Sequence, residues 1–331
     1  ATANHWFSNP ATWAPPTGTV SYNQNISPLN GVLTLDEKFL AGYIQTQYGG
    51  LLSKRLLLSL GVRYTAEIWG DNPNPNPRFQ GLDNPSNDSS IDPRFGFTFD
   101  VFGNSKTVVR GGFGWFSVSN PGQTANAVVM NNGINILPFY ISSSTNPTAF
   151  QQGNPLSMGA RVQNNHLTPL DAATLMGNAA FQDTVRINLM DPEVKMARAR
   201  AISLGVEHEM GNGFQIGVRA TFKKFANLQY ATNINLGQYN SLTAPTTDPN
   251  AIYNDGYPTT TNRFSTSARP GRAIVRGRLL DLTGFGDVSL SRYDGEGRYR
   301  SLVIELNRRA DNGWGFKSNV TFGKSEDNNS N

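Results

Sequence analysis

The ionisable side chains of this 331-residue sequence do not assemble into a catalytic set. Cysteine is absent, which excludes disulfides, thiolate zinc sites and cysteine nucleophiles. The three histidines, His5, His166 and His208, lie far apart and have no acidic partner at metal-ligand spacing. Because nothing pairs a nucleophile with a base, we expect no enzymatic activity, no cofactor and no bound metal.

Two segments imitate ligand-binding motifs. The stretch GNGFQIG at 211–217 resembles a dinucleotide-binding glycine motif, but it leads into an alternating run that predicts a strand. The motif requires a helix at that place. The run DNPNPNPRFQGLDNPSNDSS at 71–90 offers oxygen ligands of the kind that Ca²⁺ takes. Its Pro and Asn content is more typical of a solvated loop, which is our expectation.

Charged residues at alternate positions are better functional candidates. Successive side chains of a strand point to opposite faces, so charges spaced by two share one face. We assign this face to a water-filled lumen, where the charges either line the wall or contact a substrate. The residues are Arg63, Glu67, Arg94, Arg110, Glu207, Arg219, Glu305, Arg309 and Lys317.

Four hairpins carry these charges. The stretch GVEHEMGNGFQIGVRATF at 205–222 consists of two alternating runs joined at Asn212-Gly213, and the stretch at 302–322 repeats the device at Asn312-Gly313. Asn-Gly is a strong hairpin signal because both residues accept the positive φ angles of a type I′ turn. With two similar segments upstream, the sequence predicts hairpins at 39–67, 94–118, 200–225 and 299–325.

Long segments rich in Asn, Pro, Gly and Ser separate the hairpins, at 69–91, 120–198 and 226–298. Compact domains rarely contain irregular loops longer than about 15 residues. Outer-membrane barrels alternate short periplasmic turns with long extracellular loops. Within the loops we expect a short helix after Thr168 and a strand pair at 284–297.

The predicted strands suit a membrane. About 10 to 12 residues at ~3.3 Å per residue and ~40° tilt span the ~25 Å apolar band. Since every backbone group in lipid needs an internal partner, the sheet must close on itself. We therefore predict an all-β fold, an antiparallel transmembrane β-barrel with long extracellular loops. The predicted lipid-facing residues are Leu58, Leu60, Phe95, Phe97, Phe113, Leu204, Val206, Ile216, Ile304 and Phe316.

Bulk properties narrow the partners. The net charge of +4 is small and the basic residues are scattered, so we expect no nucleic-acid partner. The start, ATANHWFSNP, lacks the features of a signal peptide, and we interpret it as internal sequence. Arg198 and Arg200 fall on the outward register near a long loop. They are candidates for contact with lipopolysaccharide phosphates, although simple snorkelling explains them equally well.

Four phrases occur in an order that resembles the barrel half of Oar-like TonB-dependent receptors. They are GYIQTQYGGLLSKRLLLSLGVRYT, DPRFGFTFDVFGNSKTVVRGGFGWF, ISLGVEHEMGNGF and YRSLVIELNRRADNGWGFKSNVTFGKSED. The resemblance covers the hairpins and hardly touches the long loops. We find no TonB box, no plug segment and no terminal strand ending in an aromatic residue. The chain stops at SEDNNSN, where family members continue into further strands.

The resemblance implies a section of a barrel of roughly 22 strands, a size whose lumen needs a plug. It also implies the outer membrane of a Gram-negative bacterium, with lipid and lipopolysaccharide around the wall. The implied function is uptake or export of an unknown substrate, driven by the TonB complex through a plug that is not in this chain.

Two alternatives remain at this point. One is a passive or structural outer-membrane barrel, such as an adhesin or a scaffold of a surface assembly. The other is a soluble extracellular β-protein that binds glycans through its Asn- and aromatic-rich loops. The second requires another sheet to cover the faces that carry Leu58, Phe97, Val206 and Phe316.

Overall fold

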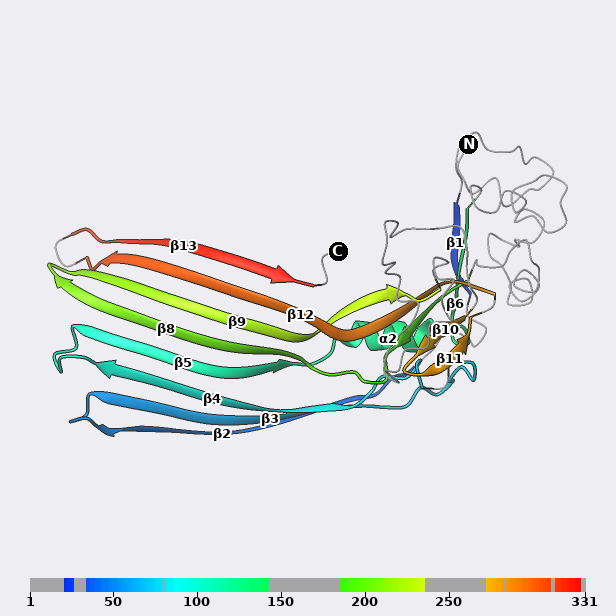
Figure 1. Ribbon diagram of the computed structural model, residues 1–331, viewed down its shortest axis with the longest axis horizontal. Coiled ribbons are helices and arrows are strands. Elements are labelled where there is room, and N and C mark those ends of the chain that lie inside the picture. The colour runs from blue at the N-terminus through cyan, green and yellow to red at the C-terminus, as the bar shows by residue number, and fades with distance from the viewer. Residues whose placement is uncertain are drawn as a thin grey trace.

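Eight long strands lie side by side and end in a smaller body of loops, short strands and a helix (Figure 1). This computed structural model describes residues 21–26, 34–79, 81–142, 185–235, 272–282, 284–310 and 313–328. The helix expected after Thr168 lies outside the described residues. Among the described residues, no helix has the length and apolarity needed to cross a bilayer.

The long strands form one continuous antiparallel surface in the order β2-β3-β4-β5-β8-β9-β12-β13. The prediction of an all-β, antiparallel fold is confirmed. The strand bounds are β2 (Glu37–Leu51), β3 (Leu56–Trp69), β4 (Asp88–Asp100), β5 (Thr107–Val118), β8 (Ala197–Gly211), β9 (Phe214–Asn233), β12 (Phe285–Arg308) and β13 (Phe316–Asp327).

The remaining elements lie at the end opposite the short turns (Figure 1). β7 pairs in parallel with the first part of β12, on the same edge of β12 that β13 occupies further along. Within the described ranges, β10 pairs only with β11, in a separate small sheet. The bounds are β1 (Ser21–Ile26), α2 (Gly122–Met130), β6 (Leu137–Ser142), β7 (Val185–Met190), β10 (Arg272–Val275) and β11 (Arg278–Asp281).

The expected strand pair at 284–297 is wrong. This segment is the first part of β12, which continues without a turn into the membrane hairpin. β9 likewise extends to Asn233, past the predicted end at 225. The two extensions pair with each other across register shifts near Gly295, so the barrel wall continues upward into the loop region. Pairing between β9 and β12 stabilises both extensions, and neither segment has a sequence pattern that predicts so long a strand.

The register aligns apolar side chains of neighbouring strands in rows on one face. One row contains Val109, Val206, Val218, Ile304 and Val320, each opposite the next. Val206 is 43% exposed, and no described residue covers this face. A soluble sandwich would bury such rows against a second sheet, so lipid is the medium that suits them. The predicted lipid-facing side chains all belong to this face, from Leu58, which is opposite Phe97, to Phe316.

The two edges of the long-strand surface are open. β2 pairs only with β3, and β13 pairs only with β12, among the described residues. An unpaired strand edge in hydrocarbon leaves its N–H and C=O groups without partners, at several kcal/mol each. In a membrane each edge therefore needs a partner strand, and in this structure the eight long strands form an open wall whose two edges do not pair with each other.

The loops beyond the strands form a packed body that we call the cap, comprising 71–79, 81–87, 120–142, 185–196, 230–235, 272–282 and 284–293. Val128 of α2 packs with Met190, Val194 and Tyr293. The Arg276 guanidinium donates from Nε and Nη2 to the two carboxylate oxygens of Asp191, which ties the β10–β11 turn to the segment after β7 and raises the pKa of Arg276. The largest fully buried side chains also belong here: Phe79, Ile187, Leu189, Met190, Met196 and Ile234.

A buried polar network replaces the solvated loop expected at 71–90. The carboxylate of Asp83, with no exposed surface, accepts hydrogen bonds from Asn72 Nδ2 at 3.2 Å, Asn76 N at 2.6 Å and Asn132 Nδ2 at 2.8 Å. Asn76 in turn donates to the carbonyl of Asn132 at 2.8 Å. The asparagines act as donors that join two loops, so the expectation of a solvated loop is wrong.

We expect Leu204→Arg to lower the free energy of unfolding by about 2–4 kcal/mol, the usual penalty for a cation at the lipid midplane. Ser203→Arg, on the opposite face of the same strand, should change it by less than about 1 kcal/mol. The measurement is urea unfolding of the full protein folded into lipid vesicles. Equal penalties for the two variants would refute the assignment of faces.

Removing the carboxylate of Asp83 should loosen the cap and leave the strands intact. Asp83→Ala leaves buried amide N–H groups without acceptors, and each unsatisfied group lowers the free energy of unfolding by about 1–3 kcal/mol. Hydrogen exchange at 72–84 and 131–135 should therefore accelerate at least about tenfold, which corresponds to ~1.4 kcal/mol. Asp71→Ala, at an exposed carboxylate, serves as the control. Unchanged exchange in Asp83→Ala would show that the network does not hold the cap together.

Candidate functional site

The face opposite the apolar rows carries the predicted lumen charges. Arg110 lies opposite Gly205, which lies opposite Arg219, and Glu207 shares a row with Gly217 and Glu305. All the predicted charges lie within the described residues, and Arg309 directly follows the last residue of β12. The predicted lumen charges do not form a single site; they lie in several separate groups along the wall.

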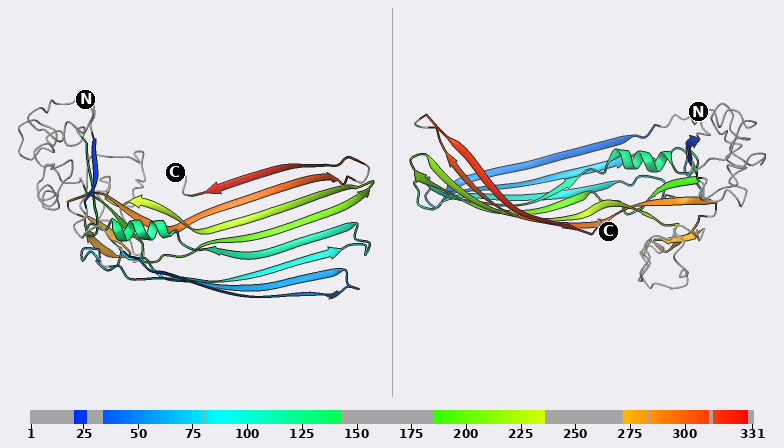
Figure 2. Two further views of the ribbon diagram at one scale, coloured as in Figure 1. Left: turned by 180° about the vertical axis from the view of Figure 1, so that it is seen from behind. Right: turned by 90° about the horizontal axis from the view of Figure 1, so that it is seen from above.

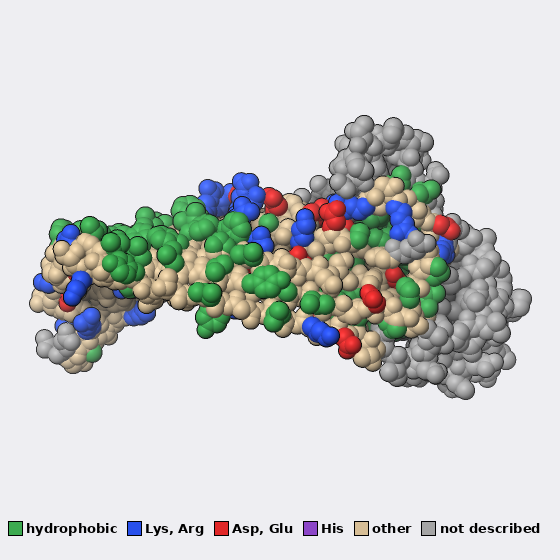
Figure 3. All heavy atoms as spheres, turned by 90° about the horizontal axis from the view of Figure 1, so that it is seen from below, with side chains coloured by type: hydrophobic (Ala, Val, Ile, Leu, Met, Phe, Trp, Pro, Cys, Tyr) green, Lys and Arg blue, Asp and Glu red, His purple; other side chains and the backbone are tan. Residues whose placement is uncertain are grey.

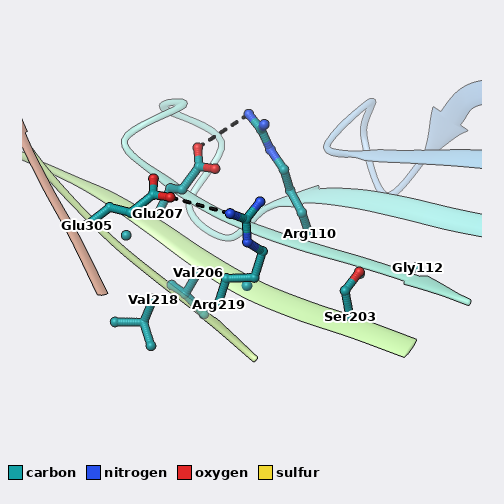
Figure 4. Close-up of a pocket in the computed structure, with 11 residues that line it drawn as sticks. Arg110, Gly112, Ser203, Val206, Glu207, Val218, Arg219 and Glu305 are labelled. Carbon is teal, nitrogen blue, oxygen red and sulfur yellow. Dashed lines mark hydrogen bonds and ion pairs between the residues drawn. The ribbon is translucent and has the colours of Figure 1, made fainter. Parts of the chain in front are cut away.

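Four of them form a group that we call the charge ladder: Arg110, Glu207, Arg219 and Glu305 (Figure 4). They come from β5, β8, β9 and β12 and surround a hollow of about 240 Å³. Arg110 Nη2 lies 3.5 Å from Glu207 Oε2, and Arg219 Nη2 lies 3.4 Å from Glu305 Oε1. Charges of opposite sign thus alternate along the wall.

Glycines on the intervening strands make room for the ladder. Gly205 lies between the two arginines in the register, and Gly217 lies between the two glutamates. A Cβ atom at Gly217 would lie 3.7 Å from Glu207 Cγ, and one at Gly205 would lie 3.5 Å from Arg219 Cβ. Because the glycines have no side chain, each arginine side chain can lie across the neighbouring strand and contact a glutamate in the adjacent row, on a diagonal.

The ladder pairs are open to water. Side-chain exposure is 58% for Arg110 and 40% for Glu207, and it is 59% for Arg219 and 35% for Glu305. Exposed pairs of this kind contribute about 1 kcal/mol or less, since water competes for both groups. The ladder therefore presents guanidinium donors and carboxylate acceptors that a ligand or a protein surface in the lumen can engage at little cost.

Arg309 and Lys317 differ in their relation to the ladder. Arg309 lines a second hollow of about 180 Å³ together with Lys106, Arg110 and Glu207, so it extends the ladder toward the short turns. Its backbone N–H donates to the carbonyl of Gly213 at 2.9 Å. Lys317 of β13 lies opposite Asn307 of β12 and lines neither of the two ladder hollows.

Arg63 and Arg94 form a separate group near the other edge of the sheet. They line a hollow of about 300 Å³ with Tyr43 and Gln45. Arg63 Nε donates to Thr65 Oγ1 at 3.2 Å. The Arg94 guanidinium lies 4.6 Å from the centre of the Phe116 ring, a cation–π contact. This group is cationic and has no carboxylate in its lining.

Glu67 does not contact the open lumen, which corrects the prediction for this residue. It lies on the lumen side but is fully buried, and its Oε2 accepts hydrogen bonds from the backbone N–H of Asn120 at 3.2 Å and from Asn120 Nδ2 at 3.0 Å. The chain that enters α2 folds inward over this strand end. A loop contact between residues 53 positions apart decides the burial, and strand periodicity carries no information about it.

Sequence reasoning missed α2, which lies over the concave side of the sheet near the cap (Figure 2). The chain before it bonds to Glu67 of β3, and within it Thr124 Oγ1 and the Gln229 side chain of β9 hydrogen-bond at 2.9 and 3.1 Å. The helix therefore narrows the lumen at the cap end. Pro121 before it and apolar residues at helical spacing, Ala125, Val128 and Val129, were the available signal.

Arg198 and Arg200 lie on the lipid-facing surface, away from the ladder. Their guanidinium carbons lie 5.4 and 4.9 Å from the Trp115 ring centre, so the indole holds both side chains. The described residues contain no group of three or more His, Asp or Glu side chains placed to hold a metal ion.

The ladder should contribute little to folding. In a double-mutant cycle with Arg110→Gln and Glu207→Gln, we expect a coupling free energy of about 0.2–1 kcal/mol. By contrast, Asp191→Asn should lower the free energy of unfolding by about 3 kcal/mol or more, because the Asp191 side chain is only 3% exposed and pairs with Arg276. Urea unfolding of the full protein measures both. A ladder coupling above about 2 kcal/mol would mean that water does not reach this face.

Comparison with known proteins places the chain in a family. No curated protein sequence matches it. Among solved structures it is similar to the FrpB iron transporter of Neisseria meningitidis (F5-1 variant), with 10% identity over 90% of this chain and 27% of that chain and a TM-score of 0.44. The copper transporter OprC matches with 9% identity over 92% of this chain and 33% of that chain, at a TM-score of 0.42.

The siderophore receptor PirA of Pseudomonas aeruginosa matches with 10% identity over 88% of this chain and 43% of that chain, at a TM-score of 0.38. The chain thus spans less than half the length of each of these proteins. The model of the outer membrane beta barrel domain family matches residues 17–331. The chain therefore belongs to the outer membrane β-barrel domain family and forms part of a barrel wall in the outer membrane of a Gram-negative bacterium.

Proposed function

We propose that this chain supplies part of the wall and the external entrance of a TonB-dependent transporter, of the Oar-like kind that its sequence resembles. The observation that carries the proposal is the combination of a charged inner face with two open sheet edges. Two edges that do not pair with each other suit a wall that further strands complete, and barrels of about 22 strands enclose a lumen that a plug fills.

The charge ladder suits contact with a plug. Its pairs are exposed on the lumen side, so a plug surface that carries both signs of charge can exchange partners with them without stranding a buried ion. A plug held by many weak contacts of this kind stays in place at rest and yields to a directed pull. TonB would supply that pull from the inner-membrane proton gradient.

The cap suits the capture of a substrate before it enters the lumen. It has its own apolar core and a buried hydrogen-bond network, so its surface is preorganised. α2 lies over the concave side at this end and limits the size of the entrance. A substrate too large or too scarce for passive pores would first bind here.

Binding to TonB tests the proposal. The full-length protein, immobilised in detergent, should retain the purified periplasmic domain of TonB, because a TonB-dependent receptor must contact it directly. Deleting the segment that precedes the plug should abolish retention, and the barrel should still show heat-dependent mobility in electrophoresis. A full-length protein that fails to retain TonB would instead be a passive or structural barrel.

A further inference from the structure

Basic side chains form adjacent rows on the outer face of the wall. Arg200 of β8 lies opposite Lys224 of β9, which lies opposite Arg298 of β12. One row closer to the short turns, Arg300 of β12 lies opposite Lys324 of β13. We call this group, with the neighbouring arginine of β8, the basic patch: Arg198, Arg200, Lys224, Arg298, Arg300 and Lys324.

The basic patch lies where the apolar surface ends. The next row toward the short turns contains Leu204, Ala220, Leu302 and Phe322 and carries no charge. Figure 3 shows basic side chains gathered at the boundary of the hydrophobic surface of the strands. Because the cap lies on the other side of the patch, this boundary is the extracellular one. The patch is thus at the level of lipid headgroups of the outer leaflet.

Several of the cations lack an acidic partner. Lys224 Nζ lies 3.2 Å from Glu296 Oε1, and Lys324 pairs with Glu326. In the described part of the chain, no carboxylate lies within ion-pair distance of Arg200, Arg298 or Arg300. These guanidinium groups line a hollow of about 420 Å³ together with Phe113, Ile202 and Phe222, which share the row of Arg300. Glu326, the partner of Lys324, also lines it. The guanidinium donors are therefore available to an anion outside the chain.

The patch is confined to one sector of the wall. On β2, β3 and β4 the outer positions beside this level hold Ile44, Val62 and Pro93, which lie opposite one another and carry no charge. Simple snorkelling, or a general attraction to headgroups, would favour cations around the whole wall. A cluster on β8, β9, β12 and β13 alone is the pattern of a binding site.

We propose that the basic patch binds the phosphate groups of the lipid A part of lipopolysaccharide, with the acyl chains along the apolar rows below. Guanidinium groups match phosphate oxygens through paired hydrogen bonds, and the lysines add positive charge. The hollow combines cations with an apolar floor, which complements an anionic lipid better than a free anion. The site would fix the level of the wall in the outer leaflet.

Lipid A titration tests this site directly. The full-length protein, purified in detergent and freed of lipopolysaccharide, is titrated with diphosphorylated lipid A, and binding is followed by native mass spectrometry. The triple variant Arg200→Gln, Arg298→Gln, Arg300→Gln should bind at least about tenfold more weakly, since it loses the charge-assisted hydrogen bonds. Lys38→Gln, which removes an outward cation of β2 outside the patch, should leave affinity within about twofold.

Two further arms identify the ligand. Dephosphorylated lipid A should bind the unchanged protein at least about tenfold more weakly, and inorganic phosphate at the same phosphate concentration should not displace lipid A. Equal binding by the triple variant, equal binding of the dephosphorylated lipid or displacement by inorganic phosphate would each overturn the proposal. If the triple variant fails to fold, the single variant Arg298→Gln should still show about threefold weaker binding. TonB retention is measured on the same variants and should not change, so failure here is distinct from failure of the proposed function.

Discussion

The obligation of every backbone N–H and C=O in lipid to find a partner underlies the whole structure. It forces the long strands into a continuous antiparallel register, and that register then decides which side chains share a row. Successive rows along the strands face opposite media. One hydrogen-bonded sheet therefore has both an apolar exterior and a charged interior. The same obligation requires that the open edges of β2 and β13 each find a partner strand in the membrane.

On the lumen side, glycine and charge depend on each other. Rows that would otherwise be crowded alternate a long ionised side chain with Gly205 or Gly217, and the diagonal pairing of Arg and Glu follows from this spacing. On the lipid side the same lattice aligns Arg200, Lys224 and Arg298 across three strands. In both places a surface with a distinct chemistry arises from residues far apart in the sequence, such as Arg110 and Glu305 of the ladder.

The cap follows a different physical rule from the wall. It buries apolar side chains such as Phe79 and Ile187 in an ordinary core and satisfies buried asparagines through Asp83. Its position is set by the extensions of β9 and β12 and by the bond between Asn120 and Glu67. A rigid cap joined to a wall by hydrogen bonds can hold an external binding surface at a defined place above the lumen.

The sequence alone determined the strand faces, because alternation in the hairpins around Asn212-Gly213 and its copy is a local property that lipid and water both enforce. Apolar and charged positions could therefore be separated before any coordinates. Tertiary structure decided what non-local contacts control: the burial of Glu67, α2 on the concave side, the Asp83 network and the union of scattered cations into the basic patch. Spacing along the chain does not encode which strands become neighbours, since that depends on pairing energies summed over the whole sheet.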